Sequence, residues 1–328
     1  MENLTEVSLD SFVLSNPPKP LSQTLNSVDS EELRTFHEAV KARGAVSVLL
    51  AAGEGSRFKS NYPKVIHPFN GKPLAQHALD AAAVCGLPVV VIVGHAKEEV
   101  VDALTFRTGE TVFVFQEQQM GTAHAVYLAK CALPDDFDGE VFVSYADNPG
   151  VDSELLTEAF ATHKKNKELY GDAYAAMILT GSRKYAGHGA SAYGRIVRKE
   201  RTSGPVVDIV EKKTITKLAL DKRSLTYDDG QVWTPEELEA IDEFNSGIVV
   251  ASGAEYYKVL GEVVASQTKF DPPKYEYYAT DFVKGLVARG KVSEGFQIPV
   301  DSMWKLEGAN TVEELRELEK KHTERVEE

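Results

Sequence analysis

Cysteine and long apolar runs are both scarce in this chain of 328 residues. Its two cysteines, Cys85 and Cys131, lie in apolar segments, so buried thiols are expected rather than a disulfide. No run reaches the roughly 20 apolar residues of a membrane span. The acidic N-terminus lacks the apolar stretch of a signal peptide. We therefore expect a soluble cytoplasmic protein.

Basic residues are also in deficit, with 36 Lys and Arg against 50 Asp and Glu and a net charge of −14. A nucleic-acid surface needs clustered Lys and Arg to neutralise phosphates, so we expect no nucleic-acid partner and no membrane. A small phosphorylated substrate needs only a local positive site and is compatible with this charge.

Residues 1–45 are interpreted as an N-terminal extension. Three prolines forbid a continuous helix in the first 26 residues, which are therefore expected to be irregular. A capping box at Asp29 and Glu32 then predicts a short helix. Its apolar face consists of Leu33, Phe36 and Val40.

Apolar strands alternate with helices in the first part of a predicted domain that spans residues 46–310. Strands are expected at 46–51, 89–93, 111–115, 141–146 and 174–180, and helices at 74–85, 97–104, 122–131 and 152–165. Near-continuous apolar strands are typical of a parallel sheet with both faces covered. The fold class is therefore α/β, with a mostly parallel sheet and helices on both faces.

The second part of the domain follows a different pattern. Segments 194–199 and 206–211 flank Gly204-Pro205 and predict a hairpin, whereas 212–243 is polar and lacks clear periodicity. A strand is expected at 244–251, and helices at 254–264 and 280–289. The chain then ends in an amphipathic helix, 311–328, with Glu314 completing a capping box.

A glycine-containing loop, residues 51–57, directly follows the first strand. Ligands of open α/β sheets bind beyond the carboxyl ends of strands, and small residues there let backbone N–H groups approach a phosphate. The dinucleotide fingerprint fails because Phe58 stands where its third glycine belongs, and the Gly-Lys-Ser/Thr ending of Walker A is absent. The loop is thus either a phosphate loop of another kind or a structural turn. Arg57 and Lys64 flank it, although each cation alone would be read as a solvated surface charge.

Eight short motifs occur in an order that resembles the sugar nucleotidyltransferases, the enzymes that make nucleotide sugars. They are Leu50-Ala-Ala-Gly-Glu-Gly-Ser-Arg57 with Pro63-Lys-Val-Ile-His67 and Gly71-Lys-Pro73, Gln116-Glu-Gln-Gln-Met-Gly-Thr-Ala-His124, Tyr145-Ala-Asp147, Tyr193-Gly-Arg-Ile196, Ile209-Val-Glu211, Asn245-Ser-Gly-Ile248, Glu276-Tyr-Tyr-Ala-Thr-Asp281 and Glu307-Gly-Ala-Asn310. The greatest similarity is to the uridylyltransferase domain of the bacterial bifunctional enzymes that make UDP-N-acetylglucosamine. It extends from about Val46 to Glu319.

The resemblance implies a Rossmann-like fold with a β-rich sugar-binding insertion. It implies transfer of a uridylyl group from UTP to a sugar 1-phosphate, N-acetylglucosamine 1-phosphate being favoured, with Mg²⁺ as cofactor. The chain ends where those enzymes continue into an acetyltransferase domain, so no acetyl transfer is expected, and we expect a monomer or weak dimer. Ala146 replaces the family's usual glycine and is expected to crowd the sugar phosphate. Pro149-Gly150 and the long stretches 184–192 and 212–243 also depart from the family pattern.

Roles carry over from the resemblance residue by residue. Arg57 and Lys64 are assigned to catalysis, while Asp147 and Asn310 are assigned to the metal. Nucleotide binding is assigned to Leu50, Ala51, Ala52, Gly53, Gln116, Gly121 and Thr122. Sugar binding is assigned to Gly194, Glu211, Asn245, Tyr278 and Thr280.

Several of these residues have plainer interpretations. Gln116 offers a donor and an acceptor to a uracil edge and Gly121 leaves room for a base, but Thr122 is equally suited to capping a helix. Asn310 is an alternative cap for the last helix, although Thr311 can fill that role. Glu211 alone reads as a surface carboxylate, and the tyrosines at 275, 277 and 278 as core aromatics. The spacing of the three histidines at 67, 77 and 124 matches no metal motif. His77 and His124 lie in predicted helices and are expected to be packing or capping residues.

Three other functions stay open at this point. One alternative changes the substrate to the 1-phosphate of glucose, galactose or another hexose, or to thymidine triphosphate, because pocket shape decides both. A non-catalytic nucleotide-sugar-binding subunit could lose Arg57, Lys64 or Asp147, yet all three are present. A glycosyltransferase commonly carries Asp-x-Asp, where this chain has Asp147-Asn-Pro149.

Overall fold

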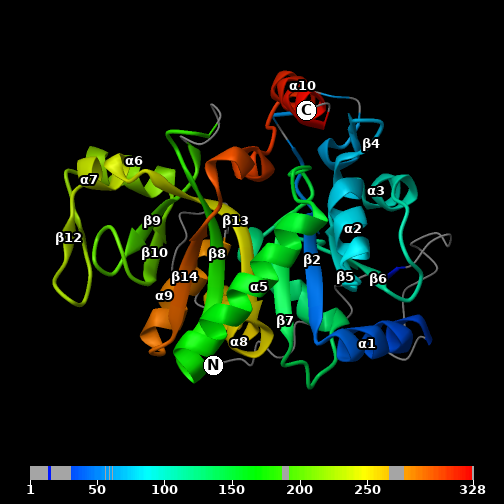
Figure 1. Cartoon of the computed structure of the whole chain (residues 1–328), viewed down its shortest axis with the longest axis horizontal. Coiled ribbons are helices and arrows are strands. Elements are labelled where there is room, and N and C mark those ends of the chain that lie inside the picture. Colours follow the sequence, from blue (N-terminus) through cyan, green and yellow to red (C-terminus); the bar gives the residue numbers. More distant parts are fainter. Residues whose placement is uncertain are drawn as a thin grey trace.

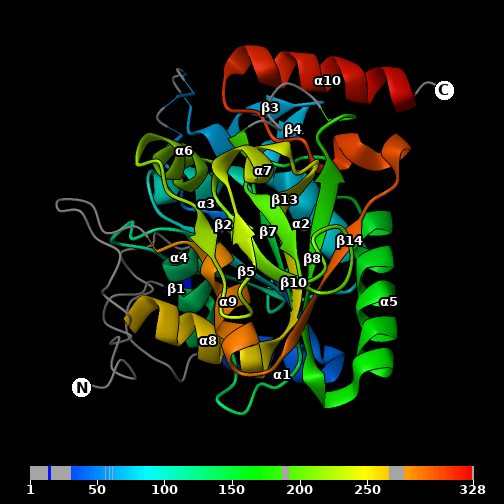
Figure 2. The ribbon, with the colours of Figure 1, turned by 90° about the vertical axis from the view of Figure 1, so that its left-hand side faces the viewer.

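The computed structural model describes residues 14–15, 31–55, 57–58, 60, 62–186, 192–265 and 277–326. One large sheet runs through this part of the chain, and helices cover both of its faces (Figures 1 and 2). Within the described ranges, no helix is both long enough and apolar enough to cross a bilayer.

The sheet has ten strands among the described residues, in the order β1-β6-β5-β2-β7-β13-β8-β14-β10-β9. Their bounds are β1 Leu14–Ser15, β2 Ala45–Ala51, β5 Val89–Val93, β6 Thr111–Phe115, β7 Glu140–Tyr145, β8 Tyr174–Ser182, β9 Arg195–Arg198, β10 Val206–Val210, β13 Glu243–Ser252 and β14 Val292–Gln297. Two short hairpins lie outside it, β3 Pro68–Phe69 with β4 Lys72–Pro73 and β11 Leu225–Thr226 with β12 Val232–Trp233.

The first part of the sheet is parallel, as predicted. β2 lies between β5 and β7, and all seven of its residues are buried. In register, Leu49 of β2 lies beside Val91 on one side and Ser144 on the other. The carboxyl ends of β2 and β7 therefore open at the same edge of the sheet, where ligands of α/β proteins bind.

The second part of the sheet is mixed. β13 runs antiparallel to both β7 and β8, β14 runs parallel to β8, and β10 pairs antiparallel with β14 and β9. The prediction of a mostly parallel sheet therefore holds only for the first part. At the far edge, β1 pairs antiparallel with β6, so the expectation of an irregular N-terminal segment is wrong at residues 14–15. The rest of that expectation, and the assignment of Tyr275, fall outside the described residues.

Each face of the sheet has its own apolar core. Helices α1, α4, α8 and α9 cover one face, and α2, α3 and α5 cover the other. Their bounds are α1 Glu31–Arg43, α2 Leu74–Val84, α3 Lys97–Ala103, α4 Thr122–Leu128, α5 Ser153–Tyr170, α8 Gly253–Ala265 and α9 Phe282–Ala288. The apolar face predicted for the first helix, Leu33, Phe36 and Val40, is buried in the first core, so the extension packs on its own sheet.

A small lobe occupies the chain between β8 and β13. Besides β9, β10 and the β11–β12 hairpin it contains α6 Lys212–Leu220 and α7 Pro235–Ala240. The stretch 212–243, for which the sequence predicted no elements, forms α6, the β11–β12 hairpin and α7, so the insertion contains helices as well as strands. These elements are too short for a clear period; α7, for example, is fixed by a capping box of Thr234 and Glu237. Their shared core consists of Val197, Val210, Ile215, Trp233 and Leu238.

The C-terminal helix α10, Val312–Val326, lies across the end of the molecule where the glycine loop is found (Figure 1). Its Leu315 and Leu318 pack in an apolar cluster with Phe58, which directly follows that loop. The helix thus packs against the end of the loop.

Candidate active site

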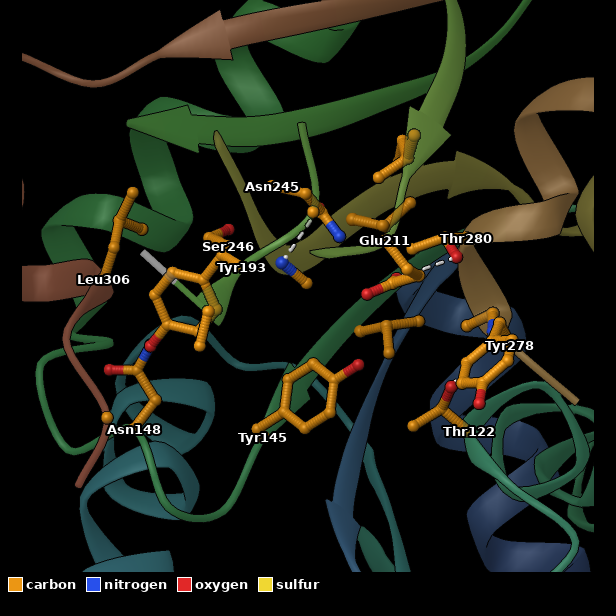
Figure 3. A pocket seen from close by; sticks show the side chains of 18 of the residues that line it. Thr122, Tyr145, Asn148, Tyr193, Glu211, Asn245, Ser246, Tyr278, Thr280 and Leu306 are labelled. Atoms are coloured by element: carbon orange, nitrogen blue, oxygen red, sulfur yellow. Dashed lines mark hydrogen bonds between the residues drawn. The ribbon is translucent and has the colours of Figure 1, made fainter. Parts of the chain in front are cut away.

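A cavity of about 310 Å³ opens at the carboxyl end of β7, between the sheet and the lobe (Figure 3). Its walls come from segments that are far apart in the sequence: the end of β7, the start of α4, β10, β13, residues 278–282 and residues 306–310. Eight residues singled out from the sequence line it, namely Thr122, Asp147, Gly194, Glu211, Asn245, Tyr278, Thr280 and Asn310.

The glycine loop begins where β2 ends, in the stretch Leu50, Ala51, Ala52 and Gly53. Ala52 is buried, and its carbonyl accepts a hydrogen bond of 2.8 Å from Nε2 of Gln119. Gly53 is exposed, with no atom within 4 Å of the position that a Cβ would occupy. The hydrogen bond from Gln119 therefore holds the loop in place, while the backbone of Gly53 stays accessible to a ligand.

Lys64 and Asp147 form an ion pair beside this loop. Lys64 opens the 3-10 helix Lys64–Ile66, and its side chain is only 10% exposed. Asp147 lies two residues beyond the end of β7, and its side chain is 34% exposed. The fold thus brings together two of the residues to which the sequence assigned catalysis and metal binding.

Arg57 and Asn310 form a second pair at the same edge. Nη2 of Arg57 donates a hydrogen bond of 3.0 Å to Oδ1 of Asn310. Thr311 is the residue whose hydroxyl caps α10, since it accepts a hydrogen bond of 3.1 Å from the backbone N–H of Glu314. The side chain of Asn310 therefore lies at the site and does not cap the helix.

The donors at this edge fit a hard divalent cation. Asp147 supplies a carboxylate and Asn310 an amide oxygen, both line the same cavity, and each already contacts a cationic side chain. Mg²⁺ is held in proteins by one or two such oxygens together with water and substrate phosphates. Among the residues that the structure describes, no cluster of three or more His, Cys, Asp or Glu forms a closed protein site.

The segment expected to read the base, residues 116–124, consists of a tight loop and the first residues of α4. Nε2 of the buried Gln116 lies 3.3 Å from the carbonyl of Gly121, to which it donates, and 3.0 Å from Nδ1 of His124. Gly121 has φ +94, and a Cβ there would lie 2.4 Å from the carbonyl oxygen of Tyr277. Packing against Tyr277 therefore requires this glycine, whereas the sequence had suggested room for a base.

Burial decides the state of His124. Desolvation lowers its pKa to about 4, because a charged imidazole would lose its hydration in this environment. The ring is therefore neutral near pH 7 and serves to pack the loop. His77 likewise contacts a backbone carbonyl, that of Phe69, at 3.0 Å. Both histidines are packing residues, as expected.

The residues assigned to the sugar surround the other end of the cavity (Figure 3). Oγ1 of Thr280 donates a hydrogen bond of 3.0 Å to Oε1 of Glu211. Oδ1 of Asn245 accepts one of 2.9 Å from the backbone N–H of Gly247, which orients its amide. The ring of Tyr278 lies under the ammonium of Lys213, 4.0 Å from Nζ. Tyr278 therefore lines the site rather than the core.

Comparison with known proteins assigns this arrangement to a family. The model of the MobA-like NTP transferase domain matches residues 47–193, which contain the glycine loop, Lys64, the base loop and Asp147. The chain contains a nucleotidyltransferase domain of this family.

Relatives of the nucleotidyltransferase include the bifunctional protein GlmU of Brevibacillus brevis, 35% identical over 253 residues that cover 76% of this chain and 46% of that protein. GlmU of Burkholderia mallei is 35% identical over 280 residues, 84% of this chain and 51% of that protein. The chain thus spans about half the length of these curated relatives.

Solved structures share the fold of the nucleotidyltransferase. A UDP-glucose pyrophosphorylase complexed with UDP-glucose aligns with a TM-score of 0.55 at 18% identity, over 86% of this chain and 99% of that chain. A putative glucose-1-phosphate thymidylyltransferase from Bacillus anthracis aligns with a TM-score of 0.51 at 19% identity, over 84% and 94%. At these identities the likeness concerns the fold alone.

The nucleotidyltransferase cavity also contains two tyrosines to which the sequence gave no role, Tyr145 and Tyr193. Desolvation raises the pKa of Tyr145, and the charges of Glu211 and Asp147 raise it further. Burial, followed by the charge of Asp147, raises the pKa of Tyr193 to about 12. Both hydroxyls thus stay protonated and can donate to a ligand. The available signal was their position, since each is the first residue of one of the motifs named above.

Ala146, which replaces the glycine usual in the family, does not face the cavity. It is 1% exposed and packs in the apolar core between the sheet and α2, α3 and α5. Its backbone N–H donates a hydrogen bond of 3.0 Å to the carbonyl of Leu50. The expectation that its methyl group crowds the sugar phosphate was therefore wrong, because the methyl group is directed into the core.

Proposed function

We propose that this nucleotidyltransferase transfers the uridylyl group of UTP to a sugar 1-phosphate, N-acetylglucosamine 1-phosphate in particular, with Mg²⁺ as cofactor. The products are UDP-N-acetylglucosamine and pyrophosphate. One observation carries the proposal: two oxygen ligands that line one cavity, Asp147 and Asn310, each pair with a cation, and the cation of one pair lies 253 positions away in the sequence. The opposite end of that cavity offers hydrogen-bonding groups suited to a sugar.

The reaction is an in-line substitution at phosphorus. A phosphate oxygen of the sugar 1-phosphate attacks the α-phosphorus of UTP, and the bond from that phosphorus to the oxygen bridging to the β-phosphate breaks. The nucleophile is already ionised, so no general base is needed. Because two anions meet, positioning and charge neutralisation supply most of the rate enhancement.

The cations have distinct tasks in this scheme. Lys64 is largely buried and held beside Asp147, so its ammonium is fixed where charge redistributes on the α-phosphate. Arg57 is exposed at the end of the glycine loop, where its planar fork suits the departing pyrophosphate. Asp147 and Asn310 would hold Mg²⁺, which neutralises phosphate oxygens when bound.

The sugar end of the cavity supports a polyhydroxylated substrate. Glu211 accepts a hydrogen bond from Thr280, and a carboxylate can accept further bonds from sugar hydroxyls. Asn245 and the protonated Tyr145 and Tyr193 add donors around the same volume. Apolar walls at Val143, Ile209 and Leu306, among others, complete the cavity and suit the faces of a sugar ring.

A pyrophosphate-release screen tests the proposal. Purified protein with Mg²⁺ is assayed with UTP, dTTP, ATP, CTP and GTP against the 1-phosphates of N-acetylglucosamine, glucose and galactose. Reactions without sugar, and with metal chelated, serve as controls. The highest kcat/KM is expected for UTP with N-acetylglucosamine 1-phosphate. A preference for another pair would correct the substrate, while UDP-sugar binding without any pyrophosphate release would establish a non-catalytic binding protein.

A further inference from the structure

A short segment, residues 277–281, joins the base loop to the sugar end of the cavity. Its first residue is docked on the loop by two backbone hydrogen bonds. The N–H of Tyr277 donates to the carbonyl of Met120 at 2.8 Å, and the N–H of Ala123 donates to the carbonyl of Tyr277 at 3.0 Å. Gly121 lies between these contacts, with the backbone of Tyr277 packed against it.

The hydroxyl of Thr122 makes the next contact along this segment. Its Oγ1 accepts a hydrogen bond of 3.0 Å from the backbone N–H of Ala279. Thr122 is the first residue of α4, and that helix has no side-chain cap, so the hydroxyl does not have the capping role suggested by the sequence. It is instead bonded to a partner 157 positions further along the chain.

The segment then reaches the sugar site. Thr280, the residue after Ala279, donates from its hydroxyl to Oε1 of Glu211 at 3.0 Å. Glu211 ends the β10 side of the cavity and precedes α6. A continuous path therefore runs from the Thr122 hydroxyl through the Ala279 backbone to the Glu211 carboxylate.

We infer that Thr122 is a positioning residue for the sugar 1-phosphate rather than a contact that fixes nucleotide affinity. The hydroxyl of Thr122 fixes the orientation of the backbone at Ala279. This orientation decides whether the hydroxyl of the next residue, Thr280, points at Glu211. Without the bond, the half-buried Ala279 N–H loses its partner, and the segment must shift to regain one. The inference rests on the proposed function.

Thr122→Val isolates the hydroxyl, because valine keeps the shape of threonine and its place at the start of α4. We expect the KM for the sugar 1-phosphate to rise roughly tenfold, as for loss of one hydrogen bond, with the KM for UTP within about twofold of the parent. Thr122→Ser keeps the acceptor and should restore the parent values. Thr157→Val is the matched control. Thr157 is an exposed threonine of α5, and its hydroxyl contacts the carbonyl of Ser153 and the thiol of Cys85, both outside the cavity.

Equilibrium binding gives a second readout that needs no turnover. Titration calorimetry compares UDP-N-acetylglucosamine with UDP, and Thr122→Val should weaken the first roughly tenfold while leaving the second unchanged. Equal weakening of both ligands would make Thr122 a nucleotide contact and overturn the inference. Parent-like binding of both would overturn it as well.

The same experiment distinguishes failure of the inference from misfolding of the variant and from failure of the proposed function. If Thr122→Val does not fold, Thr280→Val carries the test, because it breaks the next link and must give the same selective loss. A parent protein that binds neither ligand refutes the proposed function and this inference together. A parent that turns over, with Thr122→Val and Thr280→Val at parent KM for the sugar 1-phosphate, refutes the inference alone.

Discussion

Replacing Lys64 by methionine tests whether its charge takes part in the chemistry. The direction of this side chain is fixed by its surroundings. Pro63 precedes it with φ −52, and the Cβ of Lys64 packs so closely on Gly55 that a Cβ at that glycine would lie 2.9 Å away. Methionine keeps the buried stem and removes only the ammonium that pairs with Asp147.

The expected loss follows from what a preorganised charge contributes. Removing one electrostatic group aimed at a transition state costs on the order of 10²–10³ in kcat, about 3–4 kcal/mol. The effect on folding is much smaller, because the side chain of Asp147 is 34% exposed and a partly exposed pair contributes at most about 1 kcal/mol. Lys64→Met should therefore lower kcat at least a hundredfold, with a smaller change in the KM for UTP.

The chain offers a matched control for this variant. Lys72 pairs with Asp80 at 2.5 Å, but both side chains are about half exposed, 55% and 42%, and lie outside the cavity lining. Steady-state pyrophosphate release is measured for Lys64→Met, Lys64→Arg and Lys72→Met, with unfolding curves to confirm the fold. Lys72→Met should keep the parent kcat, and Lys64→Arg should not restore it, because a planar fork differs from a point charge. A Lys64→Met enzyme within twofold of the parent would refute the assigned role.

Three further outcomes are expected. Asp147→Asn should fold normally but need more Mg²⁺ for half-maximal activity and turn over more slowly; an unchanged Mg²⁺ titration would remove it from the metal site. Gly121→Ala should lower the free energy of unfolding in urea clearly more than Gly171→Ala, because only the former meets backbone, that of Tyr277; equal losses would mean that positive φ alone matters. The pKa of His124, about 4 when folded, lies below its unfolded value of 6.5, so the unfolded chain binds the extra proton and stability falls as the pH drops through this window. About 2 kcal/mol should be lost by pH 5, and His124→Gln should remove that component; a parent curve flat between pH 7 and 5 would contradict the assignment.

The parallel part of the sheet could be predicted because burial on both faces leaves a direct mark on the sequence. Two strands, Val89–Val93 and Thr111–Phe115, have the predicted bounds, and every residue of the first is buried. Such strands read as uninterrupted apolar runs. The helices between them were recognised for the same reason, since each must cover one of the faces.

Strand β14 could not be predicted, because its sequence contains no apolar run and several of its contacts are polar. Its sequence, Val292–Gln297, contains a serine, a glutamate and a glycine. Tyr170 donates to Oε1 of Glu294 at 2.5 Å, and Arg198 donates to the carbonyl of Gly295 at 3.3 Å. These partners come from distant elements, so the local sequence does not predict the strand.

At the site, too, contacts between distant segments could not be predicted from the local sequence. Lys64, Arg57 and Asp147 were selected through the ordered series of motifs that resembles a known family, because each cation alone reads as a solvated surface charge. The pairing of these residues could not be predicted, since Asn310, the partner of Arg57, lies 253 positions away. Thr122 makes the point most directly: from its neighbours it reads as a helix cap or a base contact, yet its hydroxyl bonds to Ala279. A hydroxyl accepts whichever donor the fold brings to it, so its role depends on topology and must be tested by removing that one bond.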